Sequence, residues 1–121
     1  MRLQLVKQGD FLGTKCDFYV NETGDIFMSR TQIGYALKYK NPSKGIEDIH
    51  NRHHDRLDTM SVKVDPLSLQ GSNPHYRNGE RAYMYPEKGI YEICRYSRQK
   101  VAGDFYDWVY DVIPVSYTHL R

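Results

Sequence analysis

Cationic, amide and hydroxyl side chains gather between residues 30 and 52, and their chemistry suits the binding of phosphate groups. Asn41-Pro42 predicts the start of a helix, because Asn caps a helix N-terminus and Pro fits its first turn. The free N–H groups and the dipole at such an end attract an anion. We expect the following residues to contact a nucleic-acid backbone: Arg30, Lys38, Lys40, Asn41, Ser43, Lys44 and Arg52.

A second cationic group follows at residues 95–100, where Arg95 and Arg98 join the expected DNA contacts. Both groups also have a structural interpretation. Cations near the C-terminus of a helix are stabilising without any ligand. Asp48 and Arg52 are spaced for an i,i+4 ion pair on a solvated helix face. The binding and structural interpretations both stay open at this point.

Three histidines, His50, His53 and His54, raise the question of a metal site. A zinc site needs three or four ligands, and no HExxH pattern or cysteine pair completes one in this sequence. We therefore expect packed or surface histidines, with no metal and no other cofactor. Cys16 and Cys94 lie far apart in the chain and are expected to be reduced, buried thiols.

The sequence contains no GxSxG pattern, no Cys–His signature and no phosphate-binding loop, so we expect neither an enzyme nor catalytic residues. Tyrosine is frequent, at 11 of 121 residues. Tyrosines among cations can stack on unpaired bases, and the same residues also suit strand faces and cores. A preference for single-stranded or double-stranded DNA is therefore left open.

The composition is typical of one globular domain, with 40% hydrophobic and 26% charged residues. No apolar run approaches the roughly 20 residues that cross a bilayer, and the N-terminus lacks the apolar segment of a signal peptide. These features argue against a membrane protein and a secreted precursor. The formal net charge is only +2, but residues 30–100 carry 13 basic and 8 acidic side chains. A basic middle segment permits a phosphate-binding face.

Turn residues and alternating hydrophobicity predict four strands in two pairs, besides a short first strand that ends in a turn at Gly9-Asp10. The first pair flanks a five-residue turn and forms a hairpin, and the second pair meets across a loop at residues 70–79. The expected pairs are residues 17–20 with 26–28 and residues 60–64 with 81–85.

Helix signals alternate with these strands. Ser29 and Gln32 form a capping box that starts a short helix ending near Tyr39-Lys40, and the helix capped by Asn41 is expected to end near Leu57-Asp58. Two further helices are expected after Pro86 and before Pro114. The predicted fold class is α+β: short antiparallel hairpins or a small sheet packed with about four short helices, the first two forming a helix-turn-helix-like pair.

Three motifs in this order resemble the BRO family N-terminal domain (Bro-N). Residues 32–44, read as Q-I-x-x-A-L-x-Y-x-N-P-x-K, match its first motif, Gly89-Ile90-Tyr91-Glu92-Ile93 is similar to its second, and the run 105–114 from Phe105 to Pro114 is similar to its third. The sequence departs from the Bro-N pattern at two places. Asp111 replaces the Glu that is commoner in the family, and the loop at residues 65–79 is irregular. The resemblance implies a DNA-binding domain of phage antirepressor-like proteins, usually joined to a variable second domain.

The resemblance sets the expected domain organisation. Residues 1–114 form the Bro-N-like domain, and residues 115–121 look like translated sequencing adapter, with a chance match in a natural tail as the alternative. We accordingly expect a truncated fragment whose C-terminal domain is missing.

The function that the resemblance implies is regulation of phage or prophage transcription in the cytoplasm of a bacterial host. The domain would contact the DNA backbone through its basic helix pair. Two alternatives stay open. In the first alternative, the chain is a protein-interaction module that binds a repressor or another regulator without touching DNA. In the second, it is an orphan fragment with no independent function.

Overall fold

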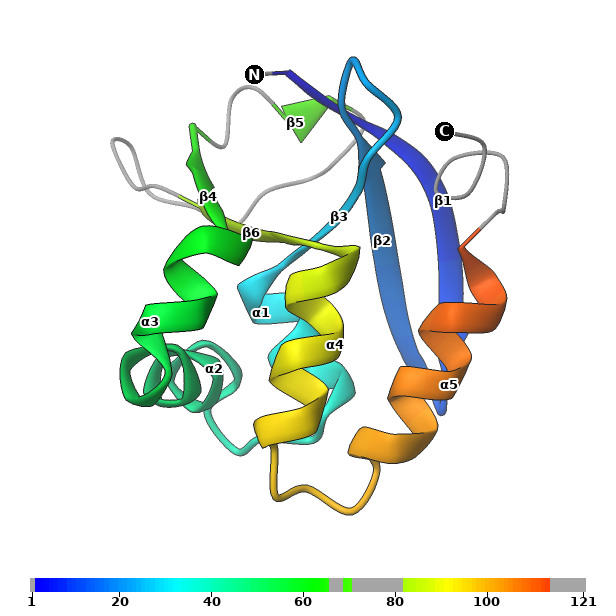
Figure 1. Ribbon diagram of the computed structural model, residues 1–121. Coiled ribbons are helices and arrows are strands. Elements are labelled where there is room, and N and C mark those ends of the chain that lie inside the picture. Colours follow the sequence, from blue (N-terminus) through cyan, green and yellow to red (C-terminus); the bar gives the residue numbers. More distant parts are fainter. Residues whose placement is uncertain (1, 66–68, 71–81, 114–121) are drawn as a thin grey trace.

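A six-stranded sheet forms one layer of the molecule in the computed structural model, which describes residues 2–65, 69–70 and 82–113 (Figure 1). Its strand order is β4-β6-β3-β2-β1-β5. All neighbouring strands are antiparallel except β1 and β5, which are parallel. The strands are β1 (Leu3–Phe11), β2 (Thr14–Val20), β3 (Ile26–Ser29), β4 (Val62–Val64), β5 (Leu69–Gln70) and β6 (Ala82–Pro86).

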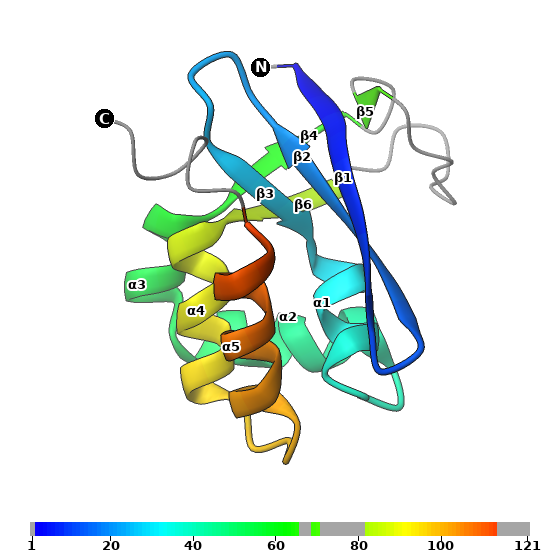
Figure 2. The same ribbon diagram turned by 90° about the vertical axis from the view of Figure 1, so that its right-hand side faces the viewer.

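The helices lie on one side of this sheet (Figure 2). They are α1 (Arg30–Ala36), α2 (Pro42–Arg52), α3 (His54–Leu57), the 3₁₀ helix η1 (Asp58–Met60), α4 (Glu87–Tyr96) and α5 (Ala102–Val112). The α+β class is therefore confirmed, with slightly more helices than expected. None of the helices in the described part of the chain is long and apolar enough to span a membrane.

Strand residues alternate between two apolar clusters, as the period of two requires. On β2 and β3, Phe18 and Met28 belong to the main core beneath the helices, whereas Tyr19 and Phe27 belong to a smaller cluster. Phe105 and Val109 bring α5 into the main core. Trp108 is half-buried and packs against the rings of three phenylalanines, namely Phe11, Phe18 and Phe105.

The predicted hairpin of β2 with β3 and the pairing of β4 with β6 are confirmed. The turn expected at Gly9-Asp10 is wrong, because β1 continues to Phe11. Gly9 instead leaves room for an aromatic ring: a Cβ at this position would lie 2.8 Å from Trp108 Cζ2. Except for Gln70 in β5, the expected loop at 70–79 lies outside the described residues.

The first two predicted helices are both shorter than expected. The first ends at Ala36, followed by a turn rather than by helix as far as Tyr39. The second ends at Arg52 because His53 leaves the helical conformation, and α3 then begins at His54. The half-buried His53 ring stacks on the Tyr96 ring at this break, with the ring centroids 3.6 Å apart.

Capping explains where these two helices begin. Ser29 Oγ accepts a hydrogen bond from the Gln32 N–H, as in a capping box. The Gln32 side chain does not reach back to Ser29; its Oε1 accepts from the Asp17 N–H at 2.6 Å and ties α1 to β2. Asn41 Oδ1 accepts from the Lys44 N–H at 3.4 Å, and Pro42 occupies the first turn of α2.

The pair α1 and α2 packs at backbone contact. Gly34 of α1 lies against the backbone of Pro42, and a Cβ at Gly34 would clash with the Pro42 carbonyl oxygen. A side chain of any size at this position would push the N-terminus of α2 away from α1. The five residues from Leu37 to Asn41 are thereby confined to one tight turn.

Replacing Gly34 by Ala tests this packing. We expect the free energy of unfolding to fall by about 1–3 kcal/mol, the usual effect of overpacking, measured by chemical denaturation. The matched control is Gly103→Ala in α5, where an added Cβ meets nothing within 4 Å. That variant should gain about 0.5–1 kcal/mol, because Ala is the better helix former. Equal stability of the two variants would contradict the packing constraint.

Candidate nucleic-acid interface

The turn between α1 and α2 presents two lysines to solvent. Lys38 has a positive φ of 65° and its N–H donates to the Tyr35 carbonyl at 3.0 Å, which closes the turn. The Tyr39 N–H donates to the Gly34 carbonyl at 3.1 Å. Lys38 and Lys40 are both exposed on this short, hydrogen-bonded segment.

The connection between α4 and α5 lies about 60 residues later in the chain, and it packs against the same turn. Gln99 Nε2 donates to the carbonyl oxygens of Leu37 and Lys38, each at 3.0 Å. The Tyr39 hydroxyl and Ser97 Oγ are 2.8 Å apart. Figure 1 shows both connections side by side at the lower end of the molecule. The two cationic groups of the sequence therefore meet in space.

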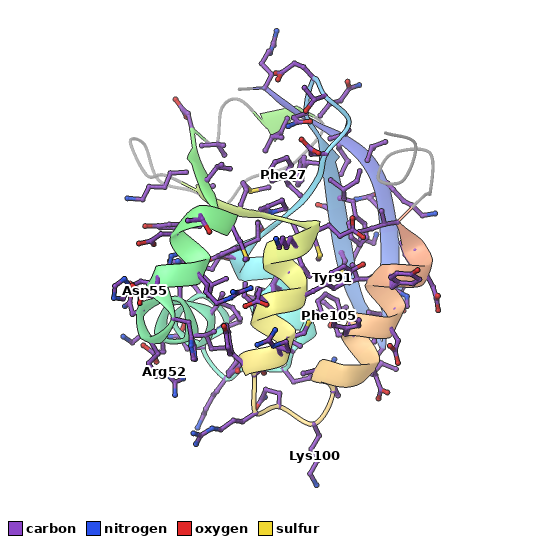
Figure 3. The ribbon with its side chains drawn as sticks, viewed as in Figure 1. Phe27, Arg52, Asp55, Tyr91, Lys100 and Phe105 are labelled. Atoms are coloured by element: carbon purple, nitrogen blue, oxygen red, sulfur yellow. The ribbon has the colours of Figure 1, made fainter. Side chains whose placement is uncertain are left out.

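The stack of His53 on Tyr96 brings the C-terminal end of α2 to the same region. We call this cationic surface the basic end. Its exposed members are Lys38, Lys40, Arg52, Arg98 and Lys100. Among the residues that the structure describes, none of these five side chains has a carboxylate partner. Arg52 and Lys100 both project away from the body of the domain (Figure 3).

Lys44 is close to this surface in sequence but is engaged by carboxylates. Its Nζ lies 3.1 Å from Asp48 Oδ1 and 3.9 Å from Glu47 Oε1. The hydrogen bond with Asp48 is the main reason that the pKa of Lys44 is raised. The Asp48–Arg52 ion pair of the structural interpretation is not seen among the described residues, because Asp48 pairs with Lys44 and Arg52 Nε donates to the Asp48 carbonyl instead. Asn41 and Ser43 are exposed at the N-terminus of α2.

Arg95 is also held by a carboxylate. Glu92, whose side chain is only 8% exposed, accepts from Arg56 Nε at 2.8 Å and from Arg95 Nη1 at 3.1 Å. The hydrogen bond from Arg56 is the largest cause of the lowered pKa of Glu92. Arg95 thus serves a structural pair, and a phosphate at this place would compete with Glu92.

Arg30 lies apart from the basic end in a cluster that joins α1 to the sheet. Its guanidinium donates to the Tyr85 hydroxyl, with Nη2 at 2.9 Å, and its Cζ lies 3.7 Å from the centre of the Tyr83 ring. His50 is buried beside it, with Nδ1 2.8 Å from the Tyr85 hydroxyl and Nε2 2.7 Å from Asp58 Oδ1. His50 is therefore a packed histidine, as expected.

The histidines and the two cysteines are the side chains that raised the question of metal or thiol chemistry. The described part of the chain holds no group of three His, Cys, Asp or Glu residues that could bind a metal ion. Cys16 and Cys94 are free and buried, and burial raises the pKa of each thiol to about 12. Both thiols are therefore protonated at neutral pH and poor nucleophiles.

Lys100 belongs to the second cationic group of the sequence, and the structure exposes it beside Arg98 at the basic end. Nothing in the local sequence indicates that Gln99 binds the Leu37 and Lys38 carbonyls. That contact is tertiary, and it is the one that merges the two predicted groups.

Comparison with known proteins identifies one family. The Bro-N model, described as BRO family, N-terminal domain, matches residues 15–114. Glutamate--tRNA ligase of Buchnera aphidicola subsp. Cinara cedri (strain Cc) is 26% identical over 74 residues, which cover 60% of this chain and 16% of that protein. The chain thus spans only a small part of that curated relative, and the likeness carries no activity to it. No solved structure gives a significant match.

Glu92→Gln tests the ion pairs that Glu92 of α4 makes with Arg56 of α3 and with Arg95. The pKa of Glu92 is lowered in the folded state. Its ion pairs therefore stabilise the fold at pH values above the ordinary glutamate pKa of about 4.3. This stabilisation is lost as the pH falls through the lower pKa that Glu92 has in the folded protein. We expect the variant to be less stable than wild type at neutral pH and the difference to shrink in acid. Denaturation at several pH values measures this.

The exposed Asp107, changed to Asn, is the control for Glu92→Gln. We expect this variant to show little difference from wild type at any pH. A stability loss in Glu92→Gln that is the same at neutral and acidic pH would show that the carboxylate charge is not what holds the two arginines.

Proposed function

Because the chain belongs to the BRO family through its N-terminal domain, we propose that it is the DNA-binding regulatory domain of a phage or prophage antirepressor-like protein. The cations of the basic end bind the phosphates of the DNA backbone. The observation that carries this proposal is the meeting of cations from three separate segments on one hydrogen-bonded surface, where no carboxylate of the described residues neutralises them.

Rigidity supports this role. Lysines on a mobile loop lose side-chain and backbone freedom when they bind, whereas this turn is already held by Gln99, Tyr39 and the contact at Gly34. Phosphate contacts of this kind position a protein on DNA without reading its sequence. The sequence reader would be another part of the surface or another domain.

The nine predicted contact residues take different parts in this proposal. Lys38, Lys40, Arg52 and Arg98 bind phosphates together with Lys100. Asn41 and Ser43 place the N-terminus of α2 toward the same backbone. Lys44 and Arg95 contribute less because each is already paired with a carboxylate. Arg30 acts indirectly by fixing α1 to Tyr85.

The proposal also covers the extent of the domain and the compartment in which it acts. We place the domain in residues 1–114, acting in the cytoplasm of a bacterial host. No catalytic step is part of this function.

Charge removal tests the proposal. The variant Lys40→Ala, Arg98→Ala, Lys100→Ala should bind a labelled random-sequence duplex more weakly than wild type, measured by fluorescence anisotropy across salt concentrations. Four or five neutralised phosphates give a log–log salt slope of roughly −4, and loss of three contacts should bring it to roughly −1.

A triple variant with the same charge loss elsewhere is the matched control. Lys7, Lys63 and Lys88 are exposed on β1, β4 and α4, away from the turns of the basic end. Their change to Ala should leave the slope near the wild-type value. An equal loss in both triple variants would show a diffuse charge effect, and absence of binding by folded wild type at low salt would contradict the proposal.

Binding of a repressor or another regulator is the second candidate function, and one surface favours it. On α5, Tyr106 and Tyr110 are 39% and 59% exposed, and the Tyr106 ring packs 4.5 Å from the Tyr91 ring. Exposed tyrosines are common anchors of protein interfaces. Asp107 and Asp111 make this surface acidic, which suits a basic partner protein and not DNA.

A further inference from the structure

The hairpin between β1 and β2 ends in an apolar tip. Phe11 pairs with Thr14, so the turn consists of Leu12 and Gly13 alone. Leu12 is 62% exposed, and among the large hydrophobic residues of the described chain it is the most exposed. A leucine that stays mostly in water contributes little apolar burial to stability.

The backbone makes this leucine more unusual. Leu12 has φ 49° and Gly13 has φ 88°, the left-handed conformation that a type I′ hairpin turn requires at both positions. Asn, Asp and Gly adopt it readily, whereas other residues are strained by roughly 1–2 kcal/mol. The fold alone would therefore favour Asn at position 12. Strain that brings no structural benefit points to function.

The tip is fixed to the basic end. Lys38 Nζ donates to the Leu12 carbonyl and to Thr14 Oγ1, each at 3.3 Å. Asp10 Oδ2 accepts from the Gly13 N–H at 3.2 Å and stands opposite Lys15, which offsets its charge. Figure 2 shows the turn of β1 and β2 at the same end of the molecule as the connection between α1 and α2.

We propose that Leu12 is a groove contact: when the basic end holds the backbone of duplex DNA, the hairpin tip enters the adjacent groove and Leu12 packs against base edges. This inference rests on the proposed function. A two-stranded ribbon fits the major groove, where an apolar side chain can contact thymine methyl groups. The Lys38 bridge keeps the tip and the phosphate contacts at one fixed separation.

Two substitutions at one position test this role. Leu12→Asn should fold with equal or higher stability, because Asn suits the turn. It should bind labelled duplex DNA roughly three- to tenfold more weakly, since an apolar contact is lost. Its salt slope should match wild type, because no charge has been removed. Leu12→Met keeps an apolar side chain and should retain most of the affinity.

The outcomes separate this inference from the proposed function. Wild type that binds with a steep salt slope, together with Leu12→Asn of equal affinity, overturns the groove contact and leaves the basic end intact. Wild type that does not bind duplex overturns both. A change in the oligomeric state of free protein on Leu12→Asn, measured by light scattering, would show that the tip contacts another copy of the chain and would also overturn the groove contact.

Discussion

The contact between Gly34 and the backbone of Pro42 is the constraint on which the proposed binding surface, the basic end, depends. It brings α1 and α2 into contact through their backbones. Because the two helices are so close, residues Leu37 to Asn41 must connect them in a tight turn. The carbonyl groups of that turn then point where Gln99 can bind them. A wider helix pair would separate the lysines of this turn from the cations between α4 and α5.

Charged residues in this domain fall into two kinds according to their partners. Glu92 and Asp48 engage Arg95 and Lys44, and these pairs support the helices. The cations of the basic end keep their charge available, because the described chain places no carboxylate against them. The net charge is only +2, yet the unpaired cations gather at one end of the domain. The local electric field depends on this local charge and not on the total charge.

Local signals in the sequence predicted most of the fold. Capping by Ser29 and Asn41, the turn before β3 and the pairing of β4 with β6 all depend on neighbouring residues or on a simple period. The errors came from tertiary contacts: Gly9 leaves room for Trp108 instead of making a turn, and the helix break at His53 accompanies its stack on Tyr96. The site was predicted as two separate cationic groups for the same reason, because nothing local joins position 99 to position 37.

Amide chemical shifts of the protein, followed by NMR during titration with duplex DNA, test the central claim most directly. The account predicts that shifts change together at residues 37–41 and 97–101 and at the N-terminus of α2, at DNA concentrations that leave α5 unaffected. Changes confined to α5 around Tyr106 and Tyr110, with both connecting segments unmoved, would contradict it. That result would make the tyrosine surface, and not the basic end, the place where this domain meets its partner.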